Sequence, residues 1–80
     1  MFPRDVLNRL KWGPAGGLER ARITYLHRGA PNDEVSIMGW QVRELGRSFF
    51  STAEARIPYH RIKRIELEGA VLYQWKNREG

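Results

Sequence analysis

The chain contains no cysteine, which excludes disulfide bonds, cysteine-ligated zinc and thiol catalysis. No apolar run approaches the roughly 18 residues of a membrane-spanning helix, and the N-terminal segment lacks the long apolar core of a signal peptide. We therefore expect a cytoplasmic protein with no membrane contact. The 80 residues suffice for a single domain, 1–80, with an ordered core over about 3–76, but not for a deep enclosed active site.

Acidic residues are in the minority, and so is lysine among the basic ones. The chain has 14 basic and nine acidic residues, a net charge of +5, and only three of the basic residues are lysines. The eleven arginines matter because a guanidinium grips phosphate through two hydrogen bonds and stacks on bases. This composition favours a nucleic-acid partner, although an ordinary solvated basic surface also accounts for it.

One helix is expected near the N-terminus, over residues 3–12. Pro3 suits the first helical position, and Asp5 lies in the first turn, where the helix dipole favours an anion. An apolar stripe recurs at helical spacing, formed by Val6, Leu7 and Leu10. Trp12 is expected to fold back under the helix end, and the glycine-rich segment 13–17 ends the helix in a loop.

The rest of the chain favours strands. Alternation and turn residues predict strands over 19–28 and 34–38, a short helical turn followed by a strand over 47–51, a strand over 56–59, and a final hairpin over 65–75. This order predicts an α+β domain in which the N-terminal helix packs on a small, strongly curved antiparallel sheet, one that could close toward a barrel.

The segment around Tyr59 breaks strand alternation. Ile62 and Ile65 are three residues apart, a spacing that no regular strand keeps on one face. Pro58 cannot donate to a central ladder. We therefore expect a turn or bulge between Tyr59 and Arg64, of the kind that re-aims side chains.

The chain has only two histidines, and an arginine follows each: His27-Arg28 and His60-Arg61. An imidazole can donate to a phosphate or move a proton, and a guanidinium can clamp the anion. Three interpretations stay open: a backbone-bonded histidine at each strand end, a phosphate or RNA contact, and acid–base catalysis. Metal binding is poorly supported because the histidines lack ligand spacing and no carboxylates cluster, so no metal or cofactor is expected.

Aromatic residues beside arginines are typical stacking platforms for RNA bases. Most aromatic residues of so small a domain must be core, and Tyr59 is the first candidate because the kink displaces it. On the helix, one face carries Arg4, Asn8 and Lys11, which either contact backbone phosphates or are simply solvated.

Four motifs together resemble a small archaeal family that has been proposed as an RNA cyclic-group end-recognition domain: PRDVLNRLKW, YLHRGAPND, LGRSFF and IPYHRIKRIEL. Related domains in larger eukaryotic proteins sit beside RNA-binding zinc fingers and cyclic-phosphate esterase domains. The chain departs from the family pattern at GPAGG and at GWQV. The polar positions that match it are Arg4, Asp5, Asn8, Lys11, His27, Arg28, Gly29, Arg47, Tyr59, His60 and Arg61.

The resemblance implies a non-catalytic domain that binds the phosphorylated or 2′,3′-cyclic-phosphate 3′ end of single-stranded RNA. Two alternatives remain. One is a metal-independent cyclic phosphodiesterase or ribonuclease that uses His27 and His60 as acid and base. The other is a protein-interaction module whose basic surface meets an acidic partner, with an exposed apolar patch around Trp40 and Phe49 as its expected sign. The oligomeric state is left open.

Overall fold

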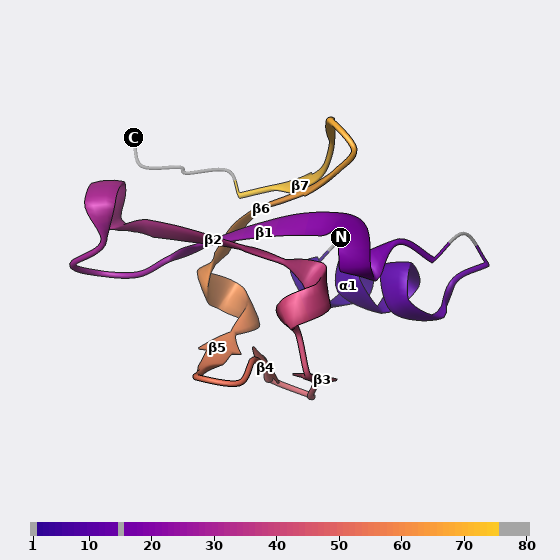
Figure 1. Ribbon diagram of the computed structural model, residues 1–80, viewed down its shortest axis with the longest axis horizontal. Coiled ribbons are helices and arrows are strands. Elements are labelled where there is room, and N and C mark those ends of the chain that lie inside the picture. The colour runs from indigo at the N-terminus through magenta and orange to yellow at the C-terminus, as the bar shows by residue number, and fades with distance from the viewer. Residues whose placement is uncertain (1, 15, 76–80) are drawn as a thin grey trace.

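The computed structural model describes residues 2–14 and 16–75 (Figure 1), so Lys76, the predicted end of the ordered core, lies outside the described residues. The helix α1 spans Pro3–Trp12, as predicted, with Pro3 in its first turn. It buries the apolar stripe Val6, Leu7 and Leu10. The expectation for Trp12 is wrong: its side chain is 74% exposed, because the chain leaves the helix in extended conformation at Gly13.

Four strands form the larger sheet, with spatial order β2-β1-β6-β7. Their bounds are β1 Ala21–Leu26, β2 Glu34–Met38, β6 Ile62–Leu67 and β7 Ala70–Gln74, and every neighbouring pair is antiparallel. The predicted strands at 19–28 and 34–38 and the final hairpin are thus confirmed, with shorter ends for the first. In both described ranges, no helix combines the length and apolar character needed to cross a membrane.

A smaller sheet, with order β3-β4-β5, lies below the larger one in the view of Figure 1. Its strands are β3 Glu44–Leu45, β4 Phe49–Ser51 and β5 Arg56–Pro58. The predicted barrel-like closure is therefore wrong. Two 3₁₀ turns, η3 Gly39–Gln41 and η4 Tyr59–Arg61, interrupt strand geometry where the chain passes between the sheets, so the two sheets do not share one ladder.

The core lies where α1 meets both sheets. The helix contacts β3 and β7 as well as η4, so it covers the junction between the sheets. The largest fully buried side chains come from all three parts: Phe50, Leu7, Ile23, Ile62 and Ile65. Burial of such side chains supplies most of the folding free energy, about 1.5–3 kcal/mol each.

The predicted kink is present. η4 comes first, and then the register of β1 with β6 shifts, since Thr24 pairs with Arg64 but Tyr25 pairs with Ile62. Lys63 is thus the extra residue of a bulge. Because the bulge reverses the alternation, Ile62 and Ile65 both point into the core.

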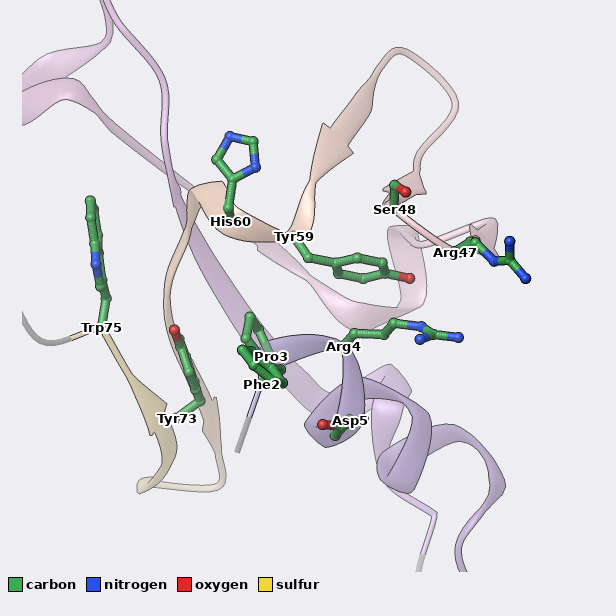
Figure 2. Close-up of a pocket in the computed structure, with 10 residues that line it drawn as sticks. All are labelled: Phe2, Pro3, Arg4, Asp5, Arg47, Ser48, Tyr59, His60, Tyr73 and Trp75. Atoms are coloured by element: carbon green, nitrogen blue, oxygen red, sulfur yellow. The ribbon is translucent and has the colours of Figure 1, made fainter.

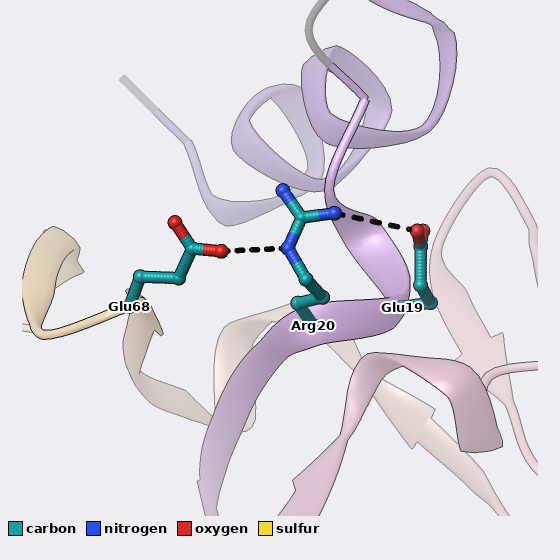
Figure 3. Close-up of polar contacts among 3 residues, drawn as sticks. All are labelled: Glu19, Arg20 and Glu68. Atoms are coloured by element: carbon teal, nitrogen blue, oxygen red, sulfur yellow. Dashed lines mark hydrogen bonds and ion pairs between the residues drawn. The ribbon is translucent and has the colours of Figure 1, made fainter.

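The hairpin that joins β6 to β7 turns at Glu68-Gly69, and both residues have positive φ angles, 50° and 87°. This geometry is that of the two-residue turns that best match the twist of antiparallel strands. Arg20, from the 3₁₀ turn η1 Leu18–Arg20, donates to the Glu68 carboxylate at 2.7 Å and lies 3.6 Å from Glu19 (Figure 3). All three side chains are at least half exposed, so these contacts contribute at most about 1 kcal/mol.

Candidate nucleic-acid interface

Both His-Arg pairs lie on one surface. They line a hollow of about 440 Å³, here called the histidine hollow, whose walls are Leu26, His27, Arg28, His60, Arg61 and Trp75. An interface that uses both pairs together requires this arrangement. Opposite faces of the fold would have excluded it.

Strand register explains why the two histidines meet. Tyr25 of β1 faces Ile62 of β6 in the antiparallel ladder. Two residues onward from Tyr25 is His27, and two residues back from Ile62 is His60. Antiparallel pairing therefore brings the two histidines to the same end of the β1/β6 ladder. The bulge at Lys63 sets this register.

The loop between β1 and β2 holds His27 and Arg28 in position. The His27 N–H donates to the Asp33 carbonyl at 2.8 Å, and the Ala30 N–H donates to the His27 carbonyl at 3.2 Å. The Gly29 N–H, at a φ of 94°, donates to the Asp33 carboxylate at 3.3 Å. Gly29 thus shapes the loop but does not itself line the histidine hollow. The edge of the His27 ring also meets Tyr25 at 6.4 Å between centroids.

Tyr59 is a buried residue that holds the neighbouring His60-Arg61 pair in position, and it is not exposed for stacking on a base. Its side chain is only 7% exposed, and its hydroxyl donates to the Gly46 carbonyl at 2.8 Å. Burial raises the pKa of the Tyr59 hydroxyl, and the positive charge of Arg4 partly opposes this shift. The kink turns Tyr59 inward against Phe50, and it turns His60 and Arg61 outward. An exposed stacking role for Tyr59 therefore conflicts with its burial.

Trp75 offers the exposed ring that Tyr59 does not. It is 40% exposed and directly follows β7. The backbone N–H of Trp75 donates to the Lys63 carbonyl at 2.7 Å, and the Lys63 ammonium lies 5.9 Å from the centroid of the Trp75 ring. Lys63 in turn donates to the Glu34 carboxylate at 2.8 Å, a bond that lowers the pKa of Glu34.

A second hollow, of about 480 Å³, adjoins the first and is here called the aromatic cavity. It shares His60 and Trp75 with the histidine hollow. Figure 2 shows His60 and Trp75 at one end and the guanidinium groups of Arg4 and Arg47 at the other. Its ring-bearing walls are Phe2, Pro3, Tyr59, His60, Tyr73 and Trp75.

Of the eleven polar positions that match the family, all except Asp5 are predicted to bind RNA or its phosphate. Seven of these ten residues line one hollow or the other, and three do not. Besides Gly29, these three are Asn8, whose amide donates to the Arg4 carbonyl at 3.1 Å, and Lys11, whose ammonium lies 4.9 Å from the centroid of the Trp12 ring. Asn8, which is half-buried, and Lys11, which is exposed, both lie on α1 outside the two hollows.

The charge pattern also distinguishes this surface. Some cations outside the hollows pair with carboxylates, such as Lys63 with Glu34 at 2.8 Å and Arg64 with Glu66 at 3.5 Å. No carboxylate of residues 2–14 or 16–75 forms an ion pair with the four arginines of the hollows, Arg4, Arg28, Arg47 and Arg61. Other arginines are also unpaired within these ranges, so the lack of a partner does not set the four apart. What distinguishes Arg28 and Arg61 is that they line one hollow together with both histidines.

Sequence reasoning did not assign Phe2 or Ser48 to this surface, and it ranked Trp75 below Tyr59. Trp75 could have been found as the last alternating position of an exposed edge strand, where a large aromatic residue has no neighbouring strand to cover it. No pattern in the sequence points to Phe2, which lines the same cavity as Trp75 only through the packing of α1 near β7.

The fold and these hollows define a small α+β domain with one basic, aromatic-lined face. The MJ1316 RNA cyclic group end recognition domain matches residues 1–75, and the chain belongs to this family. The family resemblance seen in the motifs is thus confirmed.

Similar proteins come from several archaea. A UPF0248 protein of Methanococcus maripaludis strain C7 is 37% identical over 73 residues, which cover 89% of this chain and 95% of the relative. A UPF0248 protein of Thermococcus onnurineus is 37% identical over 79 residues, with 96% and 90% covered. One from Pyrococcus abyssi is 34% identical over 77 residues, with 95% and 89% covered. No solved structure matches the chain significantly.

Proposed function

We propose that this chain binds RNA by a phosphorylated 3′ end, including the 2′,3′-cyclic form, and does not cleave it. The observation that carries the proposal is that the only two histidines, each with its arginine, line one hollow although they are far apart in the sequence. The family name, which describes recognition of cyclic-group ends of RNA, supports the same ligand.

The chemistry of the histidine hollow suits a terminal phosphate. Arg28 and Arg61 supply planar guanidinium groups that bind phosphate oxygens through paired hydrogen bonds. His27 and His60 supply further hydrogen-bond donors. Donors from two separate segments surround the anion, so a terminal phosphate fits better than a diester in the middle of a strand.

The remaining arginines suit the upstream backbone. Arg4 and Arg47 lie at the end of the aromatic cavity away from His60 (Figure 2). Contacts between arginine and backbone phosphates give affinity and orientation without sequence preference. The domain would thus combine an end-specific group with a general RNA-binding group.

Catalysis is the second candidate because both imidazoles line the same hollow. Opening a 2′,3′-cyclic phosphate needs one imidazole to accept a proton from water and another to donate a proton to the leaving oxygen. Binding alone leaves the cyclic end intact, so the recovered RNA distinguishes the two functions.

The interaction-module alternative rests on a smaller feature. Trp40 is 68% exposed, but the Arg56 guanidinium lies 5.1 Å from the centroid of the Phe49 ring and covers it in part. The predicted apolar patch is therefore reduced to Trp40. This makes Trp40→Ala a suitable control for the loss of an exposed ring outside the two hollows.

The test is a titration with short RNAs that differ only in a 3′ hydroxyl, 3′ phosphate or 2′,3′-cyclic phosphate, followed by analysis of the recovered RNA. Tighter binding to a phosphorylated end that is lost in His60→Ala and kept in Trp40→Ala supports end recognition. Conversion of the cyclic end by the wild type, abolished in His27→Ala, supports the enzyme. Equal binding of all three RNAs contradicts end recognition, and a cyclic end that is recovered unchanged contradicts the enzyme.

A further inference from the structure

The aromatic cavity contains more apolar wall than a phosphate site needs. Phosphate recognition uses hydrogen-bond donors and positive charge, which the histidine hollow already supplies. The neighbouring cavity, of about 480 Å³, is instead walled by rings and lies within the range of about 300–1,000 Å³ that small-molecule sites occupy. The wall residues Phe2 and Trp75 are 75% and 40% exposed, so two large aromatic rings at this cavity remain partly uncovered.

Stacking is the interaction that exposed aromatic rings offer to RNA. Every base has a flat face that stacks on such rings, and this contact is independent of base identity. Figure 2 shows Tyr73 between Phe2 and Trp75 along one side of the cavity, which makes a wall of three aromatic side chains. A planar heterocycle covers these rings, whereas a sugar or a phosphate leaves them in water.

Two polar groups at the cavity, Asp5 and Ser48, also suit the edge of a base. Asp5 carries the only negative charge among the residues that line it. A carboxylate repels a phosphate but accepts hydrogen bonds from the N–H groups at a base edge. Ser48 adds a hydroxyl that both donates and accepts.

The position of the cavity decides which base it takes. His60 and Trp75 line both the histidine hollow and the aromatic cavity, so the two share a wall. When the phosphate of a nucleotide lies against His60 in the histidine hollow, the base of the same nucleotide can reach the aromatic cavity on the other side of His60. At the other end, Arg4 and Arg47 are available to the phosphate that links this nucleotide to the preceding one (Figure 2).

We propose that the aromatic cavity binds the base of the terminal nucleotide, the one whose phosphate occupies the histidine hollow. The ligand is then one complete nucleotide, a nucleoside 3′-phosphate or 2′,3′-cyclic phosphate, and not a phosphate group alone. This inference rests on the proposed end recognition and adds a stacking site to it. Because stacking is tolerant of sequence, all four bases are accepted.

The first experiment removes bases from the RNA. Four oligonucleotides combine a 3′ hydroxyl or 3′ phosphate with an intact or a stable abasic terminal nucleotide, and a fifth carries the abasic position three nucleotides upstream. For phosphate-ended RNA, we expect loss of the terminal base to weaken binding by about tenfold or more. The upstream abasic position should have little effect.

Variants tie this base effect to the cavity. Phe2→Ala and Trp75→Leu should abolish the difference between intact and abasic termini, while Trp40→Leu should preserve it. Phe2, Trp75 and Trp40 are all among the exposed large side chains, so the variants should fold. A base effect that persists in Phe2→Ala and Trp75→Leu overturns the inference.

A second readout uses free nucleotides. The chain has three tryptophans, so replacing Trp12 and Trp40 by phenylalanine leaves Trp75 as the sole indole fluorophore. A nucleoside 2′,3′-cyclic monophosphate should quench its emission, and inorganic phosphate or ribose 5-phosphate should not. Equal responses to all three overturn the inference.

The failures of the two proposals are distinguishable. If phosphate-ended RNA binds more tightly than hydroxyl-ended RNA but the terminal base makes no difference, end recognition stands and the base site is refuted. If the 3′ phosphate makes no difference on intact RNA, end recognition itself is refuted, and the inference falls with it.

Discussion

Replacement of Arg47 by glutamine should reduce general RNA affinity without changing the preference for a phosphorylated end. Arg47 is exposed, lines the aromatic cavity beside Arg4, and has no ion pair with a carboxylate of the described residues. It is thus free to neutralise one backbone phosphate. Glutamine keeps much of the side-chain length and its polarity but removes the charge.

The magnitude follows from counterion release. For single-stranded nucleic acid, each neutralised phosphate contributes about −0.7 to the slope of log K against log salt. If Arg4 and Arg47 each neutralise one backbone phosphate and the histidine hollow neutralises the terminal one, the wild-type slope is about −2.1. Arg47→Gln should bring it to about −1.4. The ratio of affinities for phosphate-ended and hydroxyl-ended RNA should stay unchanged.

Arg28→Gln should do the opposite. A hydrogen bond to a charged group contributes about 1.5–3 kcal/mol, so binding of phosphate-ended RNA should weaken by about 10- to 150-fold. Hydroxyl-ended RNA should bind nearly as before, because Arg28 lines only the histidine hollow. The two arginine variants therefore separate general affinity from end preference.

The assay is fluorescence anisotropy of labelled RNAs between about 50 and 200 mM salt, with Arg22→Gln as the matched control. Arg22 is exposed and lies outside both hollows. If Arg22→Gln makes the salt slope as much shallower as Arg47→Gln does, binding is spread over the basic surface. The assignment of Arg47 to the RNA backbone is then refuted. A loss of end preference in Arg47→Gln contradicts it as well.

Three further predictions concern stability, each measured by urea unfolding. Gly39→Ala should lower the free energy of unfolding by about 3 kcal/mol or more, since an added Cβ would lie 1.7 Å from the Leu18 carbonyl oxygen. A decrease of less than about 1 kcal/mol would contradict this close approach. Tyr59→Phe should lose about 1 kcal/mol with its hydrogen bond to Gly46. Because burial raises the pKa of Tyr59 in the folded state, the wild-type advantage is present below the ordinary value of 10.0 and should shrink above it; a pH-independent difference would refute this. The pKa of Glu34 is instead lowered, so the wild-type advantage over Glu34→Gln should be present above the ordinary value of 4.5 and vanish as the pH falls below it, whereas an advantage that persists in acid would exclude the ion pair as its cause.

The elements with strong local signals were predictable. Pro3 and the apolar stripe define α1, and the two-residue turn at Glu68-Gly69 defines the last hairpin. The barrel-like closure was wrong because strand pairing depends on where ladders end, and the short 3₁₀ turns that end them have no strong sequence pattern. Trp12 was wrong for a similar reason, since the extended exit at Gly13 carries the chain away from the helix.

For the candidate site, a joint phosphate-binding role of His27 and His60 requires a shared surface, but the sequence alone does not place them on one. The spacing of Ile62 and Ile65 indicates a kink, yet it does not say which side chains turn inward. Tyr59 turns in because its hydroxyl donates to the Gly46 carbonyl, and this partner lies in the turn between β3 and β4, 13 residues earlier in the chain. Contacts between distant segments also bring Phe2 and Trp75 to the same cavity, which no local pattern encodes.

The most direct test of end recognition observes the two imidazoles themselves. Because the chain has only two histidines, their side-chain signals in ¹H–¹⁵N NMR spectra are assigned with the single variant His60→Ala. Titration with RNA that ends in a 2′,3′-cyclic phosphate should shift both signals together, and hydroxyl-ended RNA of the same sequence should leave them nearly unchanged. If both RNAs shift the same backbone signals while His27 and His60 stay unmoved, the histidine hollow does not bind the RNA end.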